Sequence, residues 1–316
     1  MKKTFQIGIK EGLLTTWQLG KIIFPITIIV SLLQHTPVMG WITAIFSPIM
    51  NLFGLPGDAA IVLALGNLVG IYAAIGAILT LTLTVKQVFI LAVMLSFSHS
   101  LFVESAIAAK IGVKVWHMVV VRLSLGFAVA WIIDLIWRGG QEIAEYGLVP
   151  AQQQLEGWIA ISTHAVESSL VGVLQIAIIV IPIMIGIQYL KDLQVLPVIA
   201  KKMTPFTRIL GVSEKTGVPL MAGLIFGIAF GAGVIIQAAK EERLTKKDLY
   251  LVSIFLVACH AVIEDTLIFI PLGIPVLPLL LIRLFTAILV TAGIAWFWSR
   301  MDADRSTNGK PIQRQA

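Results

Sequence analysis

The chain carries an internal repeat, in which residues 16–138 match residues 173–299. The match begins at an offset of 157 and, after a four-residue insertion in the second copy, continues at an offset of 161. The paired positions are Pro25 and Pro182, Gly54 and Gly211, Gly66 and Gly227, Gly70 and Gly231, His99 and His260, and Arg122 and Arg283. Shared hydrophobicity alone does not produce a match at polar, Gly and Pro positions. The chain is therefore predicted to fold as two copies of one unit.

Apolar runs of about 20 residues make up most of each copy, which predicts transmembrane helices. Only 13% of the residues are charged, against roughly 25% in soluble domains. We expect an all-α polytopic membrane protein without a removable signal peptide, because no small-residue cleavage site follows the first run. The single Cys259 excludes an intramolecular disulfide. The net charge is +6, but basic and aromatic residues are not interleaved as they are in nucleic-acid-binding proteins. No nucleic-acid partner is therefore expected.

The distribution of Lys and Arg predicts which segments cross the membrane, since cytoplasmic loops carry the excess. If every apolar segment crosses, the side of the N-terminus holds 13 of these residues and the opposite side 7. If the Gly-centred segments 58–82 and 217–239 are re-entrant hairpins, the counts become 18 and 2, whereas re-entrant His-bearing segments give 15 and 5. The hairpin interpretation predicts three crossings per half, both termini in the cytoplasm of a plasma (inner) membrane, and two inverted repeats.

This topology divides the chain into four parts. They are a first repeat with an N-terminal amphipathic helix (1–138), an acidic extracytoplasmic linker (139–156), a second, inverted repeat (157–299) and a cytoplasmic polar tail (300–316). The sequence leaves the oligomeric state open, a homo-oligomer included.

The glycines and histidines mark the candidate site. Gly66 and Gly70, with Asn67, and then Gly227 and Gly231 lie near the midpoints of the two Gly-centred segments. Glycine tolerates the backbone of a hairpin tip, although the same spacing also suits a small-residue packing face on a straight helix.

Each copy also has a helix in which a histidine precedes carboxylates. They are His99, Ser100 and Glu104 in the first, and His260, Glu264 and Asp265 in the second. Charge inside a membrane is costly unless it is paired or faces a cavity. His99 and Glu104 would lie about 140° apart on an unbroken helix, so we expect each helix to be broken at the midplane, as in transporters. Buried structural pairs are the alternative.

These Gly-centred segments, each followed by Ser98–Glu104 or by Cys259–Asp265, resemble the Gate-domain family of nucleoside-recognition membrane proteins. Its relatives include the concentrative nucleoside transporters and the membrane part of ferrous-iron transport protein B. The resemblance implies that the hairpin tips and the unwound helices line a solute site, which carries over to Gly66, Asn67, Gly70, His99, Ser100, Glu104, Gly227, Gly231, His260, Glu264 and Asp265. The nearly apolar tips lack the Gln and Glu expected for a base and ribose, and the chain has no GTPase domain.

The function expected from these residues is a permease that moves a small polar solute, nucleoside-like among the candidates, by alternating access. Histidine, with an unperturbed pKa of about 6.5, beside carboxylates favours proton coupling. A divalent metal permease is the alternative, with ligand candidates His99, Glu104, Cys259, His260, Glu264 and Asp265. A non-transport membrane subunit or a lipid-handling protein is a second alternative. No enzyme motif such as G-x-S-x-G, a P-loop or HExxH occurs, so we expect no catalytic residues and no cofactor beyond a coupling proton or divalent cation.

Two arginines complete the expected set. Arg122 and Arg283 lie about eight residues into their helices, roughly 10 Å deep. They are expected to form charge pairs with Glu104 and Asp265, within a proton relay that includes His99 and His260. An anion clamp and snorkelling side chains near the interface are the alternatives.

Overall fold

The computed structural model describes residues 2–149, 157–193, 199 and 202–307, and the described secondary structure is helical apart from an isolated bridge between Thr84 and Ile143. The elements of the first half are α1 (Lys2–Gln34), α2 (Pro37–Met50), η1 (Asn51–Phe53), α3 (Ala59–Leu68), α4 (Ile71–Ile78), α5 (Val85–Ser98), α6 (Leu101–Lys110) and α7 (Val115–Ile136). Those of the second half are α8 (Trp158–Asp192), α10 (Thr204–Ile209), η2 (Glu214–Thr216), α11 (Gly217–Glu241), α12 (Lys246–Ala258), α13 (Glu264–Leu267), η3 (Ile270–Leu272) and α14 (Val276–Thr307).

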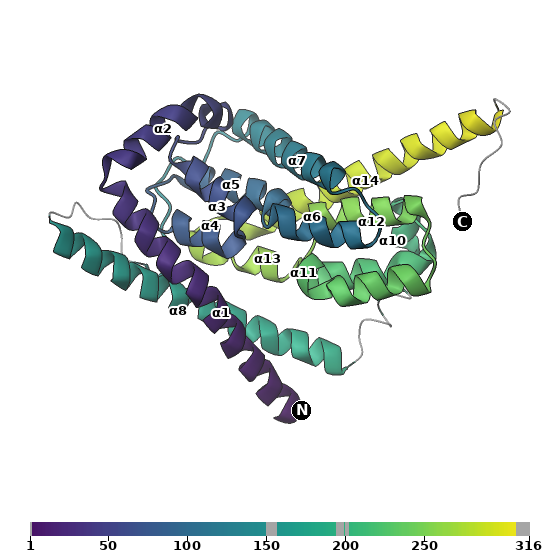
Figure 1. Cartoon of the computed structure of the whole chain (residues 1–316), viewed down its shortest axis with the longest axis horizontal. Helices are drawn as coiled ribbons and strands as arrows, with labels where there is room; N and C mark the ends of the chain where they lie inside the picture. The colour runs from purple at the N-terminus through teal and green to yellow at the C-terminus, as the bar shows by residue number, and fades with distance from the viewer. Residues whose placement is uncertain (1, 150–156, 194–198, 200–201, 308–316) are drawn as a thin grey trace.

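Helices α1 and α8, the first long helix of each half, cross each other along one side of the molecule (Figure 1). A Cβ atom added at Gly8 would lie 2.7 Å from Cα of Ile185, and one added at Gly12 would lie 2.9 Å from Cα of Ile181. Small residues at a crossing let two backbones approach closely, which is how helices associate in lipid. The predicted N-terminal amphipathic helix is not a separate element, because α1 runs unbroken from Lys2 to Gln34.

Within the described residues, five helical spans are long and apolar enough to cross a membrane. They are Lys2–Gln34, Val85–Lys110, Val115–Ile136, Trp158–Asp192 and Val276–Met301. The most apolar window of Val85–Lys110 is 83% buried inside the protein, against 17–33% for the other four. The first His-bearing segment therefore lies at the centre and can keep its polar groups away from lipid. The second one, expected to cross over residues 248–270, is interrupted after Ala258 and falls outside these five.

The two halves repeat their local structure at equivalent positions. Thr84 and Thr245 each close a capping box at the start of α5 and α12, with N3 residues Gln87 and Asp248. Such a box satisfies backbone N–H groups that a helix start leaves free. The predicted polar tail begins inside the last helix, because α14 extends to Thr307; residues 308–316 lie outside the described part of the chain.

Both Gly-centred segments are folded back on themselves. Helices α3 and α4 are separated at Gly70 and pack against each other, and α11 is broken at Gly227. A Cβ atom at Gly231 would lie 3.1 Å from the carbonyl oxygen of Ala222, whereas nine residues of straight helix would span about 13 Å. A straight packing helix is therefore wrong for both segments, and each is folded back at a glycine.

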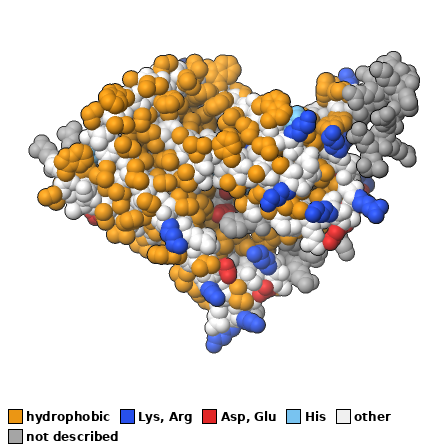
Figure 2. All heavy atoms as spheres, viewed as in Figure 1, with side chains coloured by type: hydrophobic (Ala, Val, Ile, Leu, Met, Phe, Trp, Pro, Cys, Tyr) orange, Lys and Arg blue, Asp and Glu red, His pale blue; other side chains and the backbone are white. Residues whose placement is uncertain are grey.

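The surface is divided between apolar and basic regions. Figure 2 shows hydrophobic side chains over most of the upper left of this face, while Lys and Arg gather at its right and lower edges, toward the start of α1 and the ends of α6 and α11. Large apolar side chains on α7 and α14 are exposed, such as Ile136 at 74% and Phe285 at 67%. A bilayer, rather than water, is the solvent that suits such a surface.

Candidate functional site

The broken helices place the two histidines. Helix α5 ends at Ser98, and Ser100 adopts a left-handed backbone with φ of 49°. Helix α12 ends at Ala258, and Ala261 has the equivalent φ of 42°. The breaks at the two His-bearing segments are thus confirmed, and they release backbone groups in the middle of the protein that other residues must satisfy.

Each hairpin tip is joined to the break beside it. Gly70 (φ 148°, ψ 173°) and Gly227 (φ 78°, ψ 171°) have a backbone that essentially only glycine adopts. The N–H of Ser100 donates to the carbonyl of Gly66 at 2.8 Å, and the N–H of Ala261 donates to the carbonyl of Gly223 at 3.0 Å. Hairpin and broken helix therefore form one unit in each half.

These contacts correct the predicted pairing of the glycines. Ser100 and Ala261 are equivalent, so their partners Gly66 and Gly223 are equivalent too, and Gly70 corresponds to Gly227. The pairs Gly66–Gly227 and Gly70–Gly231 predicted from the sequence are wrong by one helical turn. The four-residue insertion lies after the tip of the second hairpin, so Gly231 is not at a tip.

Arg122 forms the charged centre of the first half. Its Nη2 lies 2.8 Å from Oε2 of Glu104, and its guanidinium also donates to the carbonyls of Phe97 (2.7 Å, from Nε) and His99 (2.5 Å, from Nη2). The carbonyl of Phe97 lies in the last turn of α5, and that of His99 lies just after the helix. One buried cation therefore neutralises the carboxylate and satisfies the broken backbone.

Arg283 repeats this arrangement in the second half. Its Nη2 lies 3.0 Å from Oδ2 of Asp265 and donates to the carbonyl of His260 at 2.8 Å. Arg122 and Arg283 are both 0% exposed. The predicted charge pairs Glu104–Arg122 and Asp265–Arg283 are confirmed, and snorkelling to the interface is excluded.

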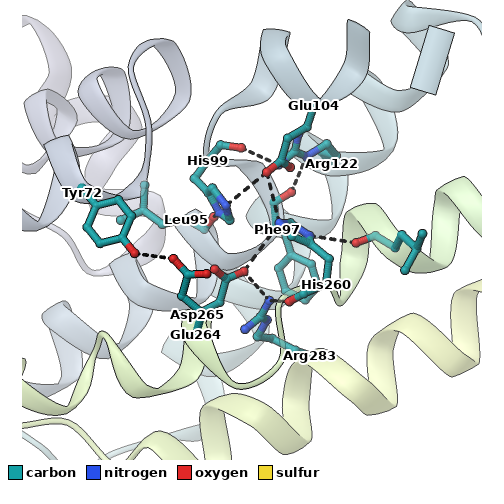
Figure 3. Close-up of polar contacts among 11 residues, drawn as sticks. Tyr72, Leu95, Phe97, His99, Glu104, Arg122, His260, Glu264, Asp265 and Arg283 are labelled. Atoms are coloured by element: carbon teal, nitrogen blue, oxygen red, sulfur yellow. Dashed lines mark hydrogen bonds and ion pairs between the residues drawn. The ribbon is translucent and has the colours of Figure 1, made fainter. Parts of the chain in front are cut away.

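The two halves meet at the histidines (Figure 3). Nε2 of His260 lies 3.1 Å from Oε1 of Glu104, and Nε2 of His99 lies 3.5 Å from the same oxygen. His260 also approaches Oδ2 of Asp265, at 3.6 Å, and the two imidazole rings are 5.2 Å apart. Glu104 of the first half thus shares a partner with Asp265 of the second.

The backbone fixes the tautomer of both neutral imidazoles. Nδ1 of His99 lies 2.7 Å from the carbonyl of Leu95, and Nδ1 of His260 lies 2.9 Å from the carbonyl of Leu256. A carbonyl oxygen only accepts, so Nδ1 carries the hydrogen and Nε2 of the neutral ring is an acceptor. Nε2 and a carboxylate oxygen then face each other as two acceptors, and a proton or another cation between them relieves the repulsion.

Tyr72 and Glu264 form a third polar pair that has no counterpart in the repeat. The hydroxyl of Tyr72 donates to Oε1 of Glu264 at 2.5 Å, and Val103 occupies the position equivalent to Glu264. Tyr72 was missed in the sequence, where its place two residues after Gly70 was the only signal. Its partner is 192 residues away, which no local pattern reveals.

A cavity of about 150 Å³ lies between the hairpin tips and the broken helices. Figure 2 shows acidic side chains in a hollow near the middle of the face. The predicted residues that line the cavity are Gly70, His99, Ser100, Glu104, Gly227, His260, Glu264 and Asp265. Gly66, Asn67 and Gly231 do not line it, and the amide of Asn67 donates instead to the carbonyl of Leu63 at 2.7 Å.

The described residues offer one donor set for a metal. His99, Glu104 and His260 each place a ligand atom within 4.8 Å of the others, whereas Cys259, Glu264 and Asp265 do not belong to this set. Two imidazole nitrogens and one carboxylate oxygen are ligand types that Zn²⁺ and Fe²⁺ bind. The nearby Arg122 already holds Glu104, which disfavours a divalent cation there.

Comparisons with known proteins show the family of this chain. The family model described as Gate, nucleoside recognition, matches residues 16–114 and 173–274. An uncharacterized membrane protein, YvoD of Bacillus subtilis (strain 168), is 52% identical over 301 residues, which cover 95% of this chain and 96% of that protein. No solved structure matches the chain. Two matches of one family model and a relative of full length show that this multi-pass membrane protein belongs to the Gate (nucleoside recognition) family.

Proposed function

We propose that the protein is a permease that moves a small polar solute through the membrane by alternating access. The observation that carries the proposal is the carboxylate-lined cavity between two repeated units, each made of a hairpin tip and a broken helix. Transporters with inverted repeats bind their solutes near the midplane at such breaks. Its volume of about 150 Å³ is below the roughly 300 Å³ of the smallest drug-sized ligand pockets. This favours a solute smaller than a nucleoside in this conformation.

The proposed topology has six crossings in two inverted repeats, with re-entrant hairpins and both termini in the cytoplasm of the plasma membrane. The helical folding-back at Gly70 and Gly227 supports the hairpins. The basic edges in Figure 2, near the start of α1 and the ends of α6 and α11, support one cytoplasmic side. The sixth crossing is assigned to the interrupted segment α12–α13.

Labelling of an introduced cysteine tests this topology. Arg243 is exposed in the turn after α11, and the natural Cys259 is buried and gives little background. We expect Arg243→Cys to react with a membrane-impermeant maleimide only in inside-out vesicles, and the linker variant Glu142→Cys to react only in intact cells. Labelling of position 243 in intact cells would overturn the re-entrant assignment.

Proton coupling is proposed from the acceptor pairs at the histidines. Each neutral imidazole presents Nε2 to Oε1 of Glu104, and a single proton can occupy either gap. Movement of the two halves would separate His260 from Glu104, because they belong to different repeats. Proton binding and the conformational change would then be linked, as alternating access requires.

Removing both imidazoles tests this linkage. We expect the purified protein to melt at a higher temperature at about pH 5.5 than at about pH 7.5, because a proton between the acceptors stabilises the folded cluster. The double variant His99→Ala, His260→Ala should lose most of this difference. His35→Ala, which removes an exposed histidine, should keep it. An unchanged pH dependence in the double variant would exclude the histidines from proton binding.

A divalent metal permease is the second candidate, because of the donor set His99, Glu104 and His260. Stabilisation of the purified protein by Fe²⁺, Mn²⁺ or Zn²⁺ alone, abolished in the histidine double variant, would favour it over the solute permease.

A further inference from the structure

The cavity offers a ligand acceptors rather than positive charge. Its lining includes three carboxylates, Glu104, Glu264 and Asp265, and none of its described lining residues is Lys or Arg. Arg122 and Arg283 lie outside the lining and are fully buried. They therefore act as internal counter-charges, and an anionic solute would meet carboxylates in the cavity.

The histidines are an independent indication of a missing donor. His99 and His260 are only 4% and 2% exposed, and both line the cavity. Their Nδ1 hydrogens are used by backbone carbonyls, so the Nε2 atoms of the neutral rings are acceptors that face a carboxylate oxygen. Buried acceptors without donors are costly. A ligand that brings N–H groups would satisfy them.

Glu264 is the carboxylate whose charge the protein leaves unbalanced. Glu104 and Asp265 each have an arginine, but among the described residues no ion pair joins Glu264 to a Lys or Arg. Its described hydrogen-bond partner is Tyr72, a neutral donor, and the side chain is 6% exposed at the cavity wall. With neutral imidazoles and all three carboxylates ionised, the two arginines leave one negative charge in excess. A single positive charge balances it, brought either by a proton or by a monovalent cation.

We propose that the cavity binds a small organic cation, a protonated amine, and that Glu264 is the residue that recognises its charge. This rests on the proposed function, because it names the class of solute for the same cavity. A divalent metal would overcompensate the single excess charge and would lie beside two arginines. The volume of about 150 Å³ leaves room for a molecule rather than a bare ion.

The test uses the purified full-length protein and three probes of similar size that differ in charge: ethanolamine (cation), ethylene glycol (neutral) and glycolate (anion), with Mn²⁺ as a fourth. We expect a saturable rise of the melting temperature with ethanolamine alone. Glu264→Gln should weaken ethanolamine binding at least about tenfold, a loss of about 1.4 kcal/mol. Glu142→Gln removes an exposed carboxylate from the linker and should bind normally.

Tyr72→Phe is the second variant, since it keeps the carboxylate and frees one of its oxygens. We expect it to bind ethanolamine at least as well as the wild type. The proposal would be overturned if glycolate or Mn²⁺ stabilised the protein instead of ethanolamine, or if none of the probes did. It would also be overturned if Glu264→Gln bound ethanolamine as well as the wild type. Ethanolamine binding without uptake into proteoliposomes would instead count against transport and leave the cation site standing. Uptake of an anion or a neutral solute without ethanolamine binding would support transport and overturn the cation site.

Discussion

Replacing Arg122 with alanine is expected to lower the free energy of unfolding by about 3–5 kcal/mol, the usual loss when one partner of a buried ion pair is removed. Nη2 of Arg122 lies 2.8 Å from Oε2 of Glu104, and the arginine side chain is 0% exposed to solvent. Without it, a carboxylate and the carbonyls of Phe97 and His99 lose a buried donor. Denaturant unfolding of the purified protein in mixed micelles measures the loss.

Two further variants make this expectation specific. Arg122→Met combined with Glu104→Gln removes both charges at similar volume, so much of the lost stability should return. The exposed pair Arg208–Glu214, with side chains 74% and 60% exposed, is the matched control, and Arg208→Ala should cost less than about 1 kcal/mol. Equal losses for Arg122→Ala and Arg208→Ala would show that burial of the first pair has no energetic consequence.

Replacing Gly70 with alanine is expected to destabilise the protein by about 1–3 kcal/mol, because its backbone conformation is essentially restricted to glycine. The added Cβ atom would also lie 3.0 Å from Oγ of Ser100, in the broken turn beside His99. Gly227→Ala should behave alike, since the tip of the second hairpin has the same strain and its Cβ would lie 3.1 Å from Cβ of Ala261. Thermal unfolding of the purified variants measures both effects.

Gly186→Ala provides the control for the hairpin tips. Gly186 lies inside α8, and a Cβ atom there would meet nothing within 4 Å. Alanine in a helix interior is favoured over glycine by about 0.5–1 kcal/mol, so this variant should be slightly more stable than the wild type. If Gly70→Ala matched it in stability, the backbone assigned to the tip would be wrong.

The register of the repeat shows where sequence reasoning reaches its limit. Gly223, Gly227 and Gly231 are spaced by four residues, so the pair Gly66 and Gly70 fits two alignments equally well. The sequence prediction chose the wrong one. The hydrogen bonds from Ser100 to Gly66 and from Ala261 to Gly223 decide it, because they join segments that are far apart in the chain.

The charge pairs show the opposite case. His99, Glu104 and Arg122, with their copies His260, Asp265 and Arg283, were predicted as a set because charge in an apolar segment needs a partner and the repeat supplies each residue twice. The contact between the two sets, from His260 to Glu104, could not be predicted from any local sequence pattern. Tyr72 was not predicted at all.

By itself the sequence determined the class of protein, the repeated unit, the breaks at the histidines and the residues that carry charge, because hydrophobicity, glycine and proline act locally. Only the tertiary structure decided which glycines form the tips, how Glu104 is shared between the halves, and that Glu264 lines the cavity and accepts a hydrogen bond from Tyr72. These features depend on the packing of segments that are not neighbours in the chain, from the hydrogen bond between Ser100 and Gly66 to the one between Tyr72 and Glu264. The local chemistry of each segment is compatible with several such packings.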